Sequence, residues 1–258
     1  MERVSRLRRR WAEAQLPVYA ANGAFFLVLS LFPILSLLLG LIGRLSLSRT
    51  EFFSVFSQLV PAAVRPLFLE AIRTAGRGAA LSVSALAGLW SASRGVYSLL
   101  QGLRRISTAP GSCGGLMLRL LSVVYTAVFL LALLVTFALH NLGHGLLGLL
   151  HNSELAASLY FVLHRRGGIC FAFLSGLFAL VYRAFPPGSG HRLRQVLPGS
   201  LLAAGGWVLF SALFSWWSGA ASDASRVYGS VAGMALAMLW LYFCLLIVLF
   251  GALLNETP

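Results

Sequence analysis

The chain has 258 residues, of which 59% are hydrophobic and only 10% are charged. A soluble domain carries roughly a quarter charged residues, so this chain has too few polar side chains to cover a globule in water. The composition excludes an ordinary soluble domain and indicates a single all-α domain in a membrane. The formal net charge of +13 comes from arginine, because the sequence contains no lysine. The arginines sit at the edges of apolar runs, a pattern that favours membrane topology and lipid headgroups over nucleic acid as their role.

The N-terminal segment, residues 1–18, is basic, with five arginines before position 11. We expect it to lie in the cytoplasm, ahead of one transmembrane domain over residues 19–258. The first apolar run, 19–43, is longer than the ~7–15-residue core of a cleavable signal peptide, so it is expected to remain as a span. Pro33 lies in the middle of this run and removes a backbone hydrogen bond, which predicts a kink.

The rest of the chain alternates apolar runs with short polar segments. Residues 51–75 mix apolar residues with charges and two prolines, which indicates interfacial amphipathic helices in the first outer loop and not a span. Lipid leaves backbone polar groups without partners, so the spans must be helices. The sequence therefore predicts six transmembrane helices, at about 19–43, 79–101, 117–140, 167–185, 196–218 and 228–254.

The orientation of these spans follows from the arginine distribution. With the N-terminus inside, 11 arginines fall in inner segments and 8 in outer segments, counted along the sequence. Positive charge favours the cytoplasmic side, so both termini are expected in the cytoplasm. The basic outer loop at 44–78 weakens this bias.

The second span carries an arginine, Arg94, within an otherwise uncharged stretch. At 100° per residue, Ser91, Ser98 and Gln101 fall within about 60° of Arg94, so one face of this helix is small and polar. Such a face turns toward protein or a polar cavity in a membrane. We expect these four residues to form a substrate-binding face near the cytoplasmic side. The alternative is that Arg94, about 22 Å into a ~30 Å core, reaches the inner headgroups as an anchor.

Small residues recur at four-residue intervals on two spans, which predicts close helix packing. On the last span they are Gly229, Gly233 and Ala237, and on the second span Ser84 and Gly88.

Residues that could support catalysis are sparse. His140 and His144 in HNLGH are one helical turn apart, but Asn141 occupies the position of a catalytic glutamate and no third ligand is evident. No nucleotide-binding loop or nucleophile motif occurs. The sequence predicts a protein that is not an enzyme and has no cofactor, no metal and no nucleic-acid partner.

Five stretches together resemble the YihY/virulence factor BrkB family of bacterial inner-membrane proteins. They are NGAFFLVLSLFPILSLLLGLIG (22–43), LVPAAVRPLFLEAI (59–72), LAGLWSASRGVYSLLQGLRRI (86–106), LVYRAFPPGSGHRLRQVLPGSLLAAGGWVLFSALFSWW (180–217) and YGSVAGMALAMLWLYFCLLIVLFGALLNE (228–256). The resemblance implies a six-helix membrane protein. The family that the chain resembles was formerly labelled ribonuclease BN, which is regarded as a misassignment. Members of that family are linked to envelope or lipid-related transport. Leu253 departs from the family pattern, in which a glutamate is usual, so any role of that carboxylate is absent here.

Two functions are consistent with the sequence. The first is a non-enzymatic inner-membrane protein that binds or transports a lipid or an amphipathic anion, with membrane lipids as its partners. The alternative is a structural or scaffolding protein of the envelope, with copies of itself or other envelope proteins as partners. A membrane ribonuclease is disfavoured, because no nuclease site can be drawn from these residues.

Overall fold

The computed structural model describes residues 9–44, 61, 64–65, 68–69, 81–107, 114–131, 166–184, 192–220 and 222–256. Within these residues the chain forms helices and no strand, so the all-α prediction is confirmed for this part of the protein. A short helix covers residues 9–14, and a further helix, Gly115–Leu131, lies between α6 and α9 in the sequence. The main helices are α2 (Leu16–Leu29), α3 (Leu31–Arg44), α6 (Leu81–Ile106), α9 (Arg166–Ala184), α10 (Leu193–Ala220) and α11 (Ser222–Asn255).

Helices lie at each position where a span is expected, but they differ in length and apolar content. Two described segments, Leu193–Ser218 and Ala232–Asn255, are long and apolar enough to cross a membrane, and α2 with α3 makes a third if they count as one broken span. α6 has sufficient length, but its serines, Gln101 and Arg94 lower its apolar content. That the chain crosses the membrane six times therefore stays a prediction. Residues 132–140 of the third expected span lie outside the described residues.

The first expected span is bent by 51° between α2 and α3. The break falls at Ser30, whose backbone N–H donates to the Phe26 carbonyl at 3.0 Å and whose hydroxyl donates to the Leu27 carbonyl at 2.8 Å. Pro33 lies three residues further on, in the first turn of α3. A proline is tolerated there because the first N–H groups of a helix have no partner within the helix.

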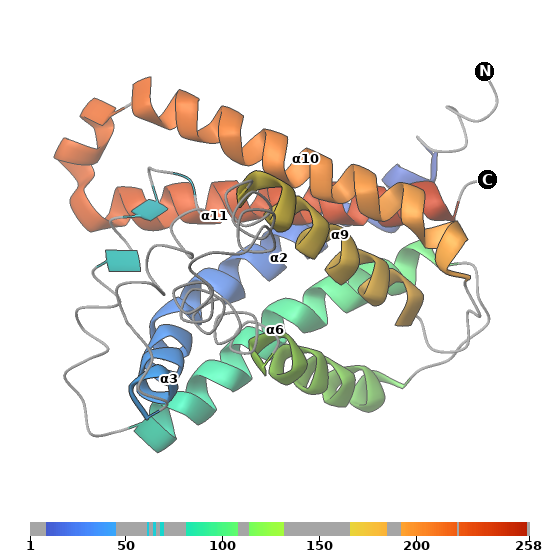
Figure 1. Cartoon of the computed structure of the whole chain (residues 1–258), viewed down its shortest axis with the longest axis horizontal. Helices are drawn as coiled ribbons and strands as arrows, with labels where there is room; N and C mark the ends of the chain where they lie inside the picture. The colour runs from blue at the N-terminus through green and yellow to red at the C-terminus, as the bar shows by residue number, and fades with distance from the viewer. Residues whose placement is uncertain are drawn as a thin grey trace, which may run out of the picture.

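The described helices pack in a consistent order, and α2, α6 and α11 each contact at least three of the others. α9 packs on α10, α10 on α11, α11 on α2, α2 on α6, and α6 on α3 (Figure 1). The contacts of α6 with α3, α2 and α11 use Gly88, Gly95 and Gly102, which recur every seven residues. A Cβ at these positions would lie 2.8 Å from Pro33 Cβ, 2.7 Å from Leu27 Cγ and 2.8 Å from Leu249 Cδ2. The glycines thus let the helix backbones approach closely.

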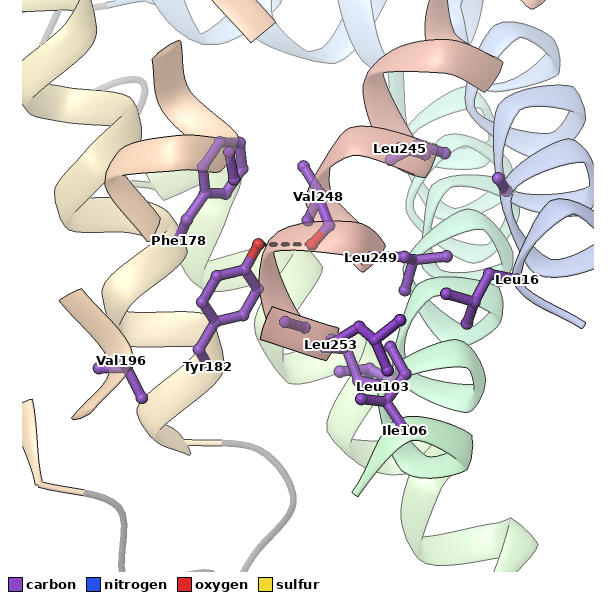
Figure 2. Packing of buried hydrophobic residues seen from close by; sticks show 14 of the residues in the cluster. Leu16, Leu103, Ile106, Phe178, Tyr182, Val196, Leu245, Val248, Leu249 and Leu253 are labelled. Carbon is purple, nitrogen blue, oxygen red and sulfur yellow. Dashed lines mark hydrogen bonds between the residues drawn. The ribbon is translucent and has the colours of Figure 1, made fainter. Parts of the chain in front are cut away.

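α11 lies at the centre of a large buried apolar cluster. Figure 2 shows Phe178, Tyr182 and Val196 on one side of it, and Leu16 together with Leu103 and Ile106 on the other. The Tyr182 hydroxyl donates to the Val248 carbonyl at 2.6 Å. This bond satisfies the one polar group that the tyrosine brings into the cluster. Leu253 is fully buried in the same cluster.

The two ends of the described chain meet at one end of the bundle (Figure 1). The Arg10 guanidinium donates to the Glu256 carbonyl at 3.0 Å, and Trp11 contacts Phe250 edge to face with ring centroids 5.7 Å apart. The two ends of the described chain therefore lie side by side, while the number of crossings and the side of the membrane stay predictions.

The interfacial segment at 51–75 is described at five positions. Val64 and Phe68 are buried, whereas Arg65 and Leu69 are exposed. Since i and i+4 share a helix face, this pattern agrees with an amphipathic helix.

Candidate functional site

Arg94 lies on the surface of the bundle, so the expected position in the interior is not observed. Its side chain is exposed, and its Cζ lies 5.3 Å from the centroid of the Phe26 ring on α2. The reason is the glycine face of α6, which α2, α3 and α11 occupy. Arg94 is turned about 100° from Gly95 and so points along the edge of this contact.

The other three residues of the expected polar face do not gather around Arg94. Ser98 is fully buried, and its hydroxyl donates to the Tyr19 carbonyl of α2 at 2.9 Å. Ser91 is partly buried, with a buried hydroxyl that has no hydrogen-bond partner among the described residues. Gln101 is partly buried. Ser98 therefore serves packing between α6 and α2, while Ser91 retains an unused donor.

A second arginine, Arg119, approaches α6 from the helix Gly115–Leu131. Its Cζ lies 4.2 Å from the centroid of the Trp90 indole and 5.9 Å from that of the Tyr97 ring. Its Nη2 donates to the Trp90 carbonyl at 3.3 Å, and its Nη1 is buried without a partner among the described residues. The sequence reading counted Arg119 only as one of the inner arginines and missed this contact.

The hydrogen bonding of the partly buried Arg119 guanidinium is weak. The Trp90 carbonyl already accepts the Ser93 hydroxyl at 2.7 Å, and in an α-helix it also faces the backbone N–H of Arg94. A third donor at 3.3 Å is beyond the usual N–H···O range. Since arginine has five N–H groups, most of the hydrogen-bonding capacity of Arg119 is available to another partner.

The charged side chains that the structure describes at this place, Arg94 and Arg119, are both positive. The printed sequence has no acidic residue between Glu70 and Glu154, so neither α6 nor the helix Gly115–Leu131 supplies a carboxylate. Two like charges beside lipid are unfavourable without a counter-ion, because the low dielectric screens them poorly. An anion bound between the two helices would relieve this repulsion.

We call Trp90, Arg94, Tyr97 and Arg119 the arginine–aromatic site. The first three are spaced i, i+4 and i+7 on α6 and so share one face, over which Arg119 reaches. Trp90 is 57% exposed, so the site opens onto the surface of the described bundle. The i, i+4, i+7 spacing of these residues was available in the sequence, but pairing with Arg119 required the packing of two helices.

The residues expected to pack helices or to kink them are placed as follows. Gly88 faces Pro33 across the α6–α3 contact, and Ala237 is buried in the second apolar cluster, which lies around α3 and α11. Gly233 is partly buried. The surroundings of Ser84 and Gly229 lie outside what the structure describes.

A polar contact that the sequence reading missed joins α10 to the end of α11. The Asn255 amide accepts from the Gly199 backbone N–H at 2.8 Å and donates to the Val196 carbonyl at 3.2 Å. Pro198 interrupts the normal hydrogen bonding of α10 here. Asn255 thus provides partners for backbone groups next to the proline, and the PG dipeptide at 198–199 was the available signal.

Metal binding finds no support in the described part of the chain. It contains no group of three or more histidine, cysteine or acidic side chains that could hold an ion. His140 and His144 lie outside the described residues.

Comparison with known proteins places the chain among membrane proteins. It is 29% identical over 243 residues to a Bacillus subtilis (strain 168) protein that carries the name ribonuclease-like protein YfkH, with 92% of this chain and 88% of that protein aligned. No solved structure matches. The model of the family described as virulence factor BrkB matches residues 7–257, nearly the whole chain. The chain therefore belongs to the BrkB virulence factor family.

Proposed function

We propose that this protein is a non-enzymatic integral protein of the bacterial inner membrane that binds, and carries across the membrane, a lipid or another amphipathic anion. The observation that supports this proposal is the arginine–aromatic site. Among the described residues, two arginines from adjacent helices lie there with no carboxylate beside them, and Nη1 of Arg119 is buried without a hydrogen-bond partner. Membrane lipids are the proposed partners, and both termini are proposed to be cytoplasmic.

The surroundings of the site favour an amphipathic ligand over a small inorganic ion. Arg94 and Trp90 are exposed on the outer surface of α6, where acyl chains would lie. On the neighbouring helix, Leu116, Leu120 and Val124 are also exposed. A ligand with an anionic group between the arginines could leave its apolar part in the lipid, so it need not enter a closed cavity.

Lipid retention tests this proposal directly. The protein is purified in mild detergent, and its bound lipids are counted by native mass spectrometry for the wild type, Arg94→Leu and Arg119→Leu. We expect each variant to lose most of the retained anionic lipid at matched membrane levels. Arg104→Leu is the matched control, because Arg104 is an exposed arginine in the last turn of the same helix.

Lysine variants separate binding from anchoring. The planar fork of arginine binds phosphate through two donors, whereas lysine offers a compact point charge. If the two arginines bind a phosphate group, Arg94→Lys and Arg119→Lys should retain less lipid than the wild type. If the arginines only anchor the helices at the headgroups, the lysine variants should retain as much, since both side chains reach headgroups equally well.

Unchanged lipid retention in all these variants would reject the proposal. It would favour the alternative, an envelope scaffold that associates with copies of itself or with other membrane proteins.

A further inference from the structure

We infer that the arginine–aromatic site selects a phosphate monoester, carried at the end of a lipid headgroup, over the phosphate diester of ordinary phospholipids. This inference rests on the proposed function, because it names the ligand class of the same site. It follows from three features of the site: its charge, its unused donors and its aromatic walls.

The charge of the site matches a dianion better than a monoanion. Arginine stays protonated in proteins, so Arg94 and Arg119 bring two positive charges. Their helices contain no acidic residue. A phosphate diester carries one negative charge, whereas a monoester carries about 1.5 to 2 near pH 7. Only the monoester neutralises both guanidinium groups where lipid screens charge poorly.

The unused donors of the site also favour a monoester. Within the described chain, two buried side-chain polar atoms have no hydrogen-bond partner, and they are Arg119 Nη1 and Ser91 Oγ. Arg119, from the helix Gly115–Leu131, bonds to the carbonyl of Trp90, the residue before Ser91, so it reaches α6 next to Ser91. The exposed guanidinium of Arg94 adds further donors one turn along the helix. A monoester presents three terminal oxygens to these donors, and a diester presents only two.

The aromatic side chains hold Arg119 and leave its edges available. Its Cζ is 4.2 Å from the Trp90 ring centroid, a distance at which the guanidinium contacts the indole. Hydrogen bonds to phosphate run in the guanidinium plane, so contact with an aromatic face does not compete with them. Trp90 therefore orients Arg119, and its indole fluorescence reports on a molecule that lies beside it.

Fluorescence quenching in nanodiscs tests the selectivity. The full-length protein is placed in phosphatidylcholine discs that contain an equal small fraction of either phosphatidic acid, a monoester, or phosphatidylglycerol, a diester, each with brominated chains. We expect severalfold stronger quenching by brominated phosphatidic acid. Arg94→Leu and Arg119→Leu should abolish this excess, and Trp90→Phe should remove its reporter. Trp216, which is 78% exposed on α10, is the control tryptophan outside the site. Trp216→Phe should leave the excess quenching by brominated phosphatidic acid unchanged.

The pH dependence of the fluorescence quenching is an independent test of the monoester inference. A phosphate monoester loses its second charge below a pKa of about 6. The preference for phosphatidic acid should therefore decline between about pH 7.5 and pH 5.5, while quenching by phosphatidylglycerol stays constant.

The outcomes are distinguishable. Equal quenching by the two anionic lipids that both arginine variants abolish would overturn the monoester inference and leave the proposed function standing. If neither anionic lipid quenches more strongly than brominated phosphatidylcholine and the arginine variants change nothing, the proposed function itself is rejected.

Competition with glycerol 3-phosphate distinguishes a lipid phosphate from a soluble one. If it displaces brominated phosphatidic acid, the monoester chemistry stands but the ligand is a soluble ester. If it does not, the lipid form is supported.

Discussion

Replacing Gly199 with alanine tests the closest helix contact that the structure describes. A Cβ on Gly199 would overlap the Gly251 carbonyl oxygen and lie 2.5 Å from both polar atoms of the Asn255 amide. These neighbours are backbone and a side chain already engaged in hydrogen bonds, so they cannot yield. We expect α10 to separate from α11 and the two Asn255 hydrogen bonds to break.

The expected loss of stability follows from three contributions. Overpacking a tight contact costs about 1–3 kcal/mol, and each lost hydrogen bond costs about 1 kcal/mol. Alanine returns about 1 kcal/mol through its higher helix propensity. The free energy of unfolding should therefore fall by about 2–4 kcal/mol.

Gly205→Ala is the matched control in the same helix. A Cβ there would meet only Phe171 Cε2 at 3.7 Å, an ordinary contact, so the propensity term should dominate and stability should be unchanged or slightly higher. Unfolding of both variants is followed by titration of mixed micelles with sodium dodecyl sulfate. Equal stability of Gly199→Ala and Gly205→Ala would refute the described contact between α10 and α11.

Three further predictions concern other parts of the molecule. Tyr182→Phe should lower the free energy of unfolding by about 1 kcal/mol, because it removes the buried bond to the Val248 carbonyl, and an unchanged value in the same titration would contradict that bond. Reporter fusions at residue 258 should give a cytoplasmic signal, and fusions within loop 44–78 a periplasmic one, with a periplasmic C-terminus rejecting the topology. The purified protein should show no ribonuclease activity, despite the name of its relative. Activity that copurifies at a constant ratio and disappears in His140→Ala would overturn this prediction.

Periodicity and composition were sufficient to predict the helices, because lipid permits few other structures. The expected helix at 167–185 and the described α9 at Arg166–Ala184 differ by one residue at each end. Other boundaries were less accurate. α6 continues to Ile106, beyond the expected end at residue 101, since Arg104 and Arg105 are favourable in the last turn of a helix. The helix therefore extends five residues beyond the expected end of the span, which itself stays a prediction.

The surroundings of Arg94 could not be predicted, because they depend on which face of α6 its neighbours occupy. The polar face of α6 suggested an interior position for this arginine. The glycines at 88, 95 and 102 form a better packing surface, and their seven-residue spacing was visible in the sequence but not used. Arg119 was out of reach of sequence reasoning, because only the fold brings residues 90 and 119 together.

A density map of the protein in nanodiscs containing phosphatidic acid tests the central claim most directly. The account predicts a phosphate-sized density between the guanidinium groups of Arg94 and Arg119, continuous with acyl-chain density along the exposed side of Trp90. A map in which both guanidinium groups contact only protein atoms or bulk headgroups, with no density between them, would contradict the claim that this site binds an amphipathic anion.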